Sequence, residues 1–512
     1  MLDFLRRLGF FSARRQLELA AVRGMIGRCM LNVGIVLICT MVVEWFVLRR
    51  LRFDVVVVGI VLAGTILSID YLTYTSAGER NYDGQAHIEY IQSLASTLRL
   101  PEPFSCVACG HPPLYYALGA LWTQALHLGG WMPLELGLQW LSLLLFFAFV
   151  VFSLLIFRSC TGHGATLRLA AALVVFWPSS IINSVRVHND SLASPLMLAA
   201  MYLTAEWDKS GRQNEFFAAL IVSVLALLTK ASGYAVGTSL LLFTALRLRS
   251  TEHRTRSLKQ VIFAALALGT TGLLTVALRT SRVPRSPCQL MLGQACNGRY
   301  VPPFPDSPSR FLSFHFHDFV SRSGTVAEDP MLNRLAKSVL FGVMPLGDPF
   351  TDTRHELLAR WLSVGLLAVV IVCVIGLPLL GVASLRANRA YLGSVAILVL
   401  FLLAFRIRAP NEFHEDFRHI FAALAPFCLC YAGVVARLNR YSKPLHHAAF
   451  ALALLMVAWS VAFFVRIPPA LHAPPTKSDG RRGTGLGLGA VVGGGDEVNG
   501  ALKTRFAPTT RA

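Results

Sequence analysis

The sequence predicts an all-α protein that crosses a membrane many times. Hydrophobic residues make up 54% of the 512 residues, and only 15% are charged. One soluble core with an ordinary polar surface cannot accommodate so many apolar side chains. Apolar runs long enough to cross about 30 Å of hydrocarbon as a helix recur along the chain. None has the alternating pattern of a transmembrane β-barrel, so we expect a bundle of about 11 to 13 transmembrane helices.

The apolar runs are continuous and separated by short polar or charged segments. We place them at residues 31–48, 54–73, 137–157, 165–183, 191–206, 215–229, 232–247, 260–279, 358–381, 391–406, 419–436 and 446–466.

One further apolar segment, residues 113–128, is expected not to cross the membrane. It begins with two prolines, is short, and is followed by Gly129 and Gly130. The arginine-rich segments on either side, Arg49–Arg52 and Arg158–Arg168, both favour the cytoplasm, which requires an even number of spans between them. We therefore expect a re-entrant or interfacial helix.

The net charge of +19 is spread over short segments between apolar runs and forms no continuous basic stripe. This pattern argues against nucleic-acid binding and instead follows the positive-inside rule. The basic segment 247–259 marks the cytoplasmic face. Counting spans outward from it predicts external loops at residues 74–136, 184–190, 280–357 and 407–418.

The chain is expected to have three parts. Residues 1–28 alternate hydrophobic residues with arginines, which is typical of an amphipathic helix on an anionic membrane surface. Residues 29–466 form the transmembrane domain, and the Gly/Pro-rich residues 467–512 are expected to be disordered. Arginines flank the run 31–48 on both sides, so it is either a non-crossing hairpin or a span that exports the N-terminus.

Four of the ten cysteines fall in expected external loops, where an oxidising compartment permits disulfides. Cys288 and Cys296 are expected to pair. Cys106 and Cys109 directly precede His111, and a local disulfide, half of a zinc site or a redox pair would each explain them. A second pair at ligand spacing is missing from the sequence, which favours the disulfide.

Ionisable residues gather in the first external loop. Asp83, His87 and Glu89 stand in one short run, and His111 opens the motif His-Pro-Pro-Leu-Tyr-Tyr. An ionisable group near hydrocarbon costs several kcal/mol unless it lies in water or in a polar cavity. The first hypothesis is therefore an active site.

Two later segments carry similar groups. Asn189 or Asp190 could simply cap the next helix, but Arg186 and His188 beside them favour a shared site with the first loop. Lys230 ends an apolar run on the same face, where many lysines only extend to the membrane surface.

A third polar segment, residues 411–419, contains Arg418 beside several acids. An arginine at a membrane boundary is suited to bind a lipid phosphate.

These segments together resemble the GT-C superfamily of integral-membrane glycosyltransferases, in the bacterial branch related to protein O-mannosyltransferases and to the aminoarabinose transferase of lipid A. The first external loop resembles that family in the string Asp-Gly-Gln-Ala-His-Ile-Glu-Tyr from Asp83 and in the motif at His111. Later segments resemble it in the same order, at residues 186–193, 228–230 and 417–426.

The resemblance implies a GT-C-type bundle that moves a sugar from a polyprenyl phosphate to an acceptor at the external face, with inversion. It implies Asp83 as the general base, and Arg186, Lys230 and Arg418 as the groups that hold the phosphate. Residues implied to bind the sugar or the acceptor are His87, Tyr90, His111, Tyr115, Asn189 and Asp190.

The chain departs from this family at two positions. Gly84 stands where many relatives have a second acid, and His419 where they have a tyrosine. The first departure leaves the metal requirement open, and nothing in the sequence supports a bound divalent cation.

The alternative function is a transporter or flippase of a lipid-linked or small polar substrate. Transporters place charges at mid-span between broken helices, whereas these polar groups concentrate in loops. We therefore expect a multi-pass protein of a bacterial inner membrane with its site facing the periplasm. Its partners would be membrane lipids, a polyprenyl-phosphate-linked sugar and a lipid, glycan or protein acceptor.

Overall fold

A computed structural model describes residues 34, 37–75, 84–103, 105, 106, 108–129, 132–162, 164–249, 254–280, 313–321, 332, 333, 353–381, 388–408 and 421–465. Two compact units divide the chain at Arg466, and all of these residues belong to the first unit. Asp83, Arg418, Cys288 and Cys296 lie outside the described residues, as do the expected amphipathic segment 1–28 and the expected tail 467–512.

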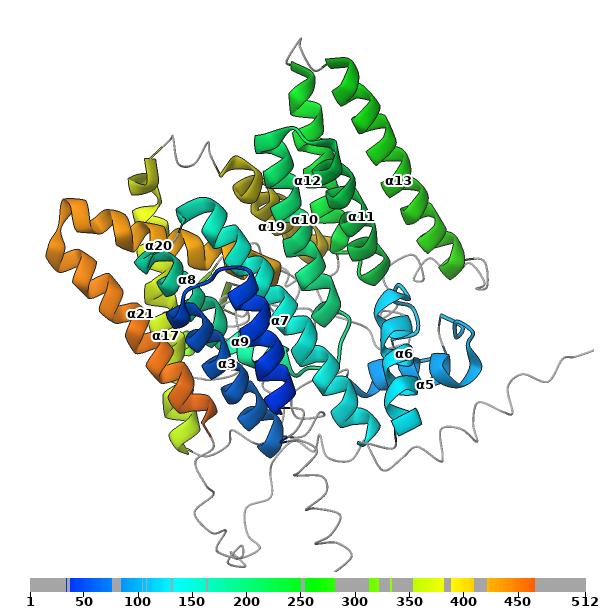
Figure 1. The fold of residues 1–512 in the computed structure, drawn as a ribbon. Helices are drawn as coiled ribbons and strands as arrows, with labels where there is room; N and C mark the ends of the chain where they lie inside the picture. The colour runs from blue at the N-terminus through cyan, green and yellow to red at the C-terminus, as the bar shows by residue number, and fades with distance from the viewer. Residues whose placement is uncertain are drawn as a thin grey trace, which may run out of the picture. The chain divides into compact units, whose positions relative to one another are not determined.

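In the described part of the chain, fifteen α-helices and two short 3₁₀ helices have defined bounds and no residue lies in a strand, so the predicted all-α class is confirmed (Figure 1). The helices are α3 (Val55–Tyr74), α5 (Gly84–Thr97), α6 (Leu114–Gly129), α7 (Leu134–Thr161), α8 (Ala165–Phe176), α9 (Pro178–Ser184), α10 (Asp190–Ser210), α11 (Gln213–Thr229), α12 (Gly233–Leu246), α13 (Arg254–Thr280), α15 (Phe316–Ser321), α17 (Thr353–Gly376), α19 (Arg389–Arg408), α20 (Leu424–Tyr441) and α21 (Lys443–Phe464), with η1 (Arg247–Arg249) and η4 (Leu377–Leu380). Residues 37–50 are also helical.

Six of the described helices are long and apolar enough to cross a membrane, namely α3, α7, α13, α17, α20 and α21. The pair α8 and α9 makes a seventh if it is counted as one bent span. The chain is therefore an integral, multi-pass membrane protein. This number is below the expected 11 to 13 because α11, α12 and α19 are shorter apolar helices and because α10 has charged residues in its last turns.

The segment expected to be re-entrant forms α6, which is not among the six candidate spans of the described residues. The helix begins at Leu114, directly after two prolines. Proline is tolerated at the start of a helix but interrupts its interior, so this position is the expected one. α6 packs against α5 and α7, and α5 and α6 lie side by side in Figure 1.

The expected run 165–183 is broken instead of straight. α8 and α9 meet at an angle of 58°. Pro178 cannot donate a helical hydrogen bond and disfavours helical backbone at the residue before it, and Trp177 is accordingly extended, with ψ of 133°. The break turns α9 away from the direction of α8 and places its polar residues inside the helix bundle, where α9 packs against α3 and α7.

Candidate functional site

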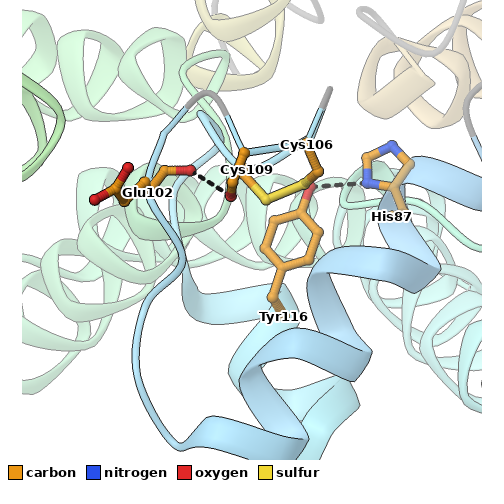
Figure 2. The surroundings of a disulfide bond; sticks show 6 residues. His87, Glu102, Cys106, Cys109 and Tyr116 are labelled. Carbon is orange, nitrogen blue, oxygen red and sulfur yellow. Dashed lines mark hydrogen bonds between the residues drawn. A yellow bond between two sulfur atoms is a disulfide. The ribbon is translucent and has the colours of Figure 1, made fainter. Parts of the chain in front are cut away.

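The first external segment forms a stack of aromatic and imidazole rings. His87 and Tyr90 lie on one buried face of α5, since they are three residues apart. The Tyr116 ring of α6 is nearly parallel to both, with its centroid 3.8 Å from that of Tyr90 and 5.7 Å from that of His87. His87 Nδ1 is 2.8 Å from the Tyr116 hydroxyl oxygen (Figure 2). Glu89 is exposed, so only one face of α5 contributes to this stack.

His111 continues the ring stack. Its ring is stacked on His87, with 5.8 Å between centroids and 14° between planes. The backbone N–H of His111 donates to the Ala108 carbonyl oxygen at 2.9 Å, which closes a turn before the prolines. The ring of His111 is only partly buried, whereas His87 is 1% exposed. His111 is therefore the ring of the stack that is most accessible to a ligand.

A disulfide holds the loop that carries His111. Cys106 and Cys109 are joined, with their Cα atoms 5.1 Å apart, which is the local pairing that the sequence favours over a zinc or redox pair. Figure 2 shows the disulfide together with Tyr116 and His87. Cys109 is buried in one apolar cluster with Tyr115 and Tyr116. The loop is thus attached to the ring stack by packing as well as by its covalent bond.

Tyr115 connects this stack to the next polar segment. Its side chain is fully buried and packs edge-on against Tyr116, with 5.4 Å between centroids. Burial raises the pKa of the Tyr115 hydroxyl far above its usual value, and the negative charge of the nearby Asp190 adds to the rise. The phenol therefore stays protonated and acts as a neutral group beside that carboxylate.

The second polar segment runs from α9 into α10 and is entirely buried. Every residue from Trp177 to Ser191 is buried, although most of them are polar or charged. The polar residues are Ser179, Ser180, Asn183, Ser184, Arg186, His188, Asn189, Asp190 and Ser191. Burying such groups inside an apolar bundle is costly unless they are hydrogen-bonded or serve a ligand.

His188 organises this segment. The backbone N–H of Ser191 donates to His188 Nδ1 at 3.1 Å, so Nε2 of the neutral ring carries the hydrogen. His188 Nε2 can then donate to Asn183 Oδ1, which is also 3.1 Å away. The Ser191 hydroxyl donates to the Arg186 carbonyl oxygen at 2.9 Å. These bonds hold the end of α9, the loop and the start of α10 in one arrangement.

Asp190 forms an ion pair with Lys230. The Lys230 ammonium is 2.5 Å from Asp190 Oδ2, and the two side chains are only 12% and 3% exposed. Asp190 begins α10, but its side chain is directed to this pair instead of capping the helix, and Asn189 makes no side-chain cap either. The amide nitrogen of Asn189 instead donates to the Thr229 carbonyl oxygen at 3.5 Å. Lys230 is therefore an inward-facing cation and does not extend to a membrane surface.

A tight turn positions Lys230. α11 ends at Thr229, Lys230 is extended, and the N–H of Gly233 donates to the Lys230 carbonyl oxygen at 2.9 Å. A Cβ atom at Gly233 would lie 2.5 Å from the backbone of Ala226 and Leu227. Only glycine fits this close approach of α12 to α11, so the turn that presents the lysine requires Gly233.

The ring stack and the ion pair lie close together, since the charge of Asp190 acts on the Tyr115 hydroxyl. Val187, from the loop between α9 and α10, packs in the same buried cluster as Tyr115 and Tyr116. Two expected members, Asp83 and Arg418, lie outside the described residues, although Asp83 directly precedes the first residue of α5. No group of three or more His, Cys, Asp or Glu residues within the described ranges could hold a metal ion.

Two residues of this site were not singled out from the sequence. Tyr116 stands in the quoted motif, but only the structure reveals that it stacks on both His87 and Tyr90. Asn183 ends an apolar run, and the available signal was the group of polar residues that directly follows Pro178. Such a group inside a predicted span indicates a broken helix.

Comparisons with known proteins give weak likenesses to solved structures only. No protein-family model matches the sequence, and no curated protein matches it. The chain is similar to the archaeal oligosaccharyltransferase AglB from Archaeoglobus fulgidus in complex with an inhibitory peptide and a dolichol-phosphate, at 13% identity and a TM-score of 0.46, over 80% of this chain and 56% of that one. It is also similar to ArnT from Cupriavidus metallidurans bound to undecaprenyl phosphate, at 16% identity and a TM-score of 0.36, over 80% and 76%. The chain thus spans little more than half the length of the archaeal enzyme.

Proposed function

We propose that this protein is a membrane glycosyltransferase that moves a sugar from a polyprenyl phosphate to an acceptor hydroxyl. The observation that carries the proposal is the buried Asp190–Lys230 ion pair beside the ring stack of His87, His111 and Tyr116, within a bundle of apolar helices. A lipid-linked sugar phosphate has an apolar chain, an anionic group and a polar ring. Apolar helices, a buried cation and hydrogen-bonding side chains are complementary to these three parts.

In the proposed reaction, Asp83 accepts the proton of the acceptor hydroxyl as that oxygen attacks the anomeric carbon of the sugar. The bond from this carbon to the phosphate oxygen breaks, and the configuration at the carbon inverts. The polyprenyl phosphate leaves with the bonding electrons. Lys230, Arg186 and Arg418 would stabilise its growing negative charge.

The proposed orientation places the site on the external face of a bacterial inner membrane. The disulfide between Cys106 and Cys109 supports this orientation, because disulfides persist in oxidising compartments. His111, Tyr115 and Asn189 would then orient the sugar or the acceptor as it arrives from the periplasm.

The Asp83→Asn variant tests the base role. We expect the turnover of undecaprenyl-phosphate-linked sugars by the purified protein to fall about 10²- to 10⁴-fold, the usual contribution of a general base. Glu89→Gln is a matched control, because Glu89 is an exposed acid on α5 and should leave turnover unchanged. Membranes of cells with Asp83→Asn should also lack one surface glycan. Undiminished turnover by Asp83→Asn would rule out the base role.

A transporter or flippase is the second candidate, because two features within the helices favour it. The α8–α9 pair is a broken helix, and the carboxylate of Glu44 is buried, with its oxygens 2.8 and 2.9 Å from the Thr65 hydroxyl. A flippase would move a labelled sugar lipid across vesicles without cleaving it. A transferase releases polyprenyl phosphate in detergent, where no transport can occur.

A further inference from the structure

α13 is the most exposed of the candidate spans. Only 22% of its apolar stretch is buried inside the molecule, the smallest share among the six candidate spans of the described residues. One side of α13 packs against α11 and α12, and Figure 1 shows the helix at the edge of the bundle. The remaining surface of α13 is therefore available to lipid or to another molecule in the membrane.

The line along which α13 packs on α11, here called the α11–α13 seam, has an apolar outer side. The Phe217 ring of α11 meets the Phe263 ring of α13 edge-on, with 5.6 Å between centroids and 80° between planes. These two side chains are 42% and 52% exposed. Ile221 and Leu266, one turn further along each helix, are 59% and 60% exposed. Adjoining helices thus present large apolar side chains to the surroundings at the same level.

Cations lie at the start of both helices of the seam. Arg212 directly precedes α11, and Arg256 and Lys259 are in the first turns of α13. Arg256 and Lys259 share a helix face with Phe263, because they precede it by seven and four residues. The Arg256 guanidinium donates to the Gly211 carbonyl oxygen at 3.1 Å, which places it at the turn that leads into α11. The cations and the rings therefore belong to the same seam.

The positive charge of the seam is only partly neutralised within the described part of the chain. Arg212 pairs with Glu215 at 2.6 Å. Arg256 and Lys259 form no ion pair with an acid of the described residues, and both are exposed. α11 and α13 also both begin here, so the positive ends of two helix dipoles add to these charges. The seam therefore attracts an anion from outside the chain.

We propose that the α11–α13 seam binds an anionic phospholipid. The phosphate of the lipid contacts Arg256 and Lys259, as juxtamembrane cations contact anionic head groups elsewhere. Its acyl chains lie over the Phe217 and Phe263 rings, since seven helical residues separate Arg256 from Phe263 by about 10 Å. A zwitterionic lipid fits less well, because its head group brings a positive charge to the same cations.

This lipid site is separate from the candidate functional site. Arg256 contacts Gly211, which follows the last residue of α10, whereas Asp190 is the first residue of that helix. A helix of this length separates its two ends by about 30 Å. The lipid site therefore does not depend on the proposed glycosyl transfer.

Lipid titrations of the purified full-length protein in detergent, followed by native mass spectrometry, test the seam. The probes are phosphatidylglycerol, which is anionic, and phosphatidylcholine with the same acyl chains, which has no net charge. The wild type is expected to bind phosphatidylglycerol about tenfold more tightly, or more. Arg256→Gln combined with Lys259→Gln should remove most of that preference, and high salt should weaken it in the wild type.

Two matched controls separate the seam from the rest of the surface. Arg440→Gln combined with Lys443→Gln removes the same charge from exposed positions where α20 meets α21, and it should leave the preference unchanged. Phe263→Ala should weaken the binding of phosphatidylglycerol, because the acyl chains lose an aromatic contact. Leu273→Ala should not weaken it, since Leu273 is 72% exposed on α13 but lies ten residues beyond Phe263. All of these positions are exposed, so the variants should keep the wild-type melting temperature.

Four results would overturn the proposal. The first is equal binding of the two lipids by the wild type. The second is a preference that survives in the Arg256→Gln, Lys259→Gln variant or falls equally in the charge control, because the charge of the whole face would then attract the lipid. The third is an equal loss of binding in Phe263→Ala and Leu273→Ala. The fourth is competition by glycerol phosphate as strong as that of phosphatidylglycerol itself, which would identify a site for free phosphate.

Discussion

Individual side chains in this site are held by partners far away in the sequence. Asp190 and Lys230 are 40 residues apart, yet they form a nearly dry ion pair. A buried pair of this kind adds little net stability, because removing both charges from water costs about as much as their attraction returns. Removing only one of the two side chains strongly destabilises the protein, because the charge of the other then stays buried without a partner.

Lys230→Met is therefore expected to destabilise the protein by about 3–5 kcal/mol, because it leaves Asp190 unpaired. Lys230→Met combined with Asp190→Asn should recover most of that loss, since no buried charge remains. Thermal unfolding in detergent, arranged as a double-mutant cycle, measures both effects. Additive losses in the double variant would show that the two side chains do not interact.

At the scale of single helices, local signals decide where the helices begin, end and break. Asp54 precedes α3, and its carboxylate accepts from the Val57 backbone N–H at 3.0 Å and from Arg168 at 3.2 Å. Burial by itself would raise the pKa of Asp54, but the hydrogen bonds and the positive charge of Arg168 outweigh it and lower that pKa. The cap therefore stabilises the ionised form.

Asp54→Ala is expected to cost about 0.5–2 kcal/mol at neutral pH, as the loss of a helix cap does. A lowered pKa in the folded state means that the stabilisation is complete above the unfolded pKa of about 3.8 and is lost as the pH falls below it. The difference in melting temperature between wild type and Asp54→Ala should thus shrink at pH 3. Asp54→Asn keeps a cap acceptor and should lose less than Asp54→Ala.

At the scale of the whole molecule, the proposed orientation in the membrane rests on the charge pattern and on the disulfide. The basic segment 247–259 marks one face, and the loop that contains Cys106 and Cys109 is assigned to the other. The positive-inside rule and the preference of disulfides for oxidising compartments both support this proposed orientation.

Single cysteines introduced at exposed positions test this orientation. In a background without the free cysteines, Glu89→Cys should react with a membrane-impermeant maleimide in intact cells, because Glu89 is exposed on the proposed external face. Lys259→Cys is also at an exposed position, but it should react only after the membrane is opened. The reverse pattern would invert the proposed topology.

The sequence alone was sufficient to predict the helical membrane class and the positions of most of the long apolar helices, although not α5 or the break between α8 and α9. Hydropathy, proline position and charge are local properties, so they can be read along the chain. The sequence was not sufficient to count the spans. Some of the expected spans form helices that are too short to cross a membrane, and α10 has charged residues in its last turns.

Only the tertiary structure decided which polar groups meet. The Asp190–Lys230 pair depends on the turn at Gly233, the ring stack depends on the packing of α5 against α6, and the α11–α13 seam depends on the packing of α13 against α11. These contacts join residues on different helices, and their geometry follows from how the helices pack. Local sequence patterns carry no information about that packing, so the sequence indicated the chemistry of the site while the fold determined its arrangement.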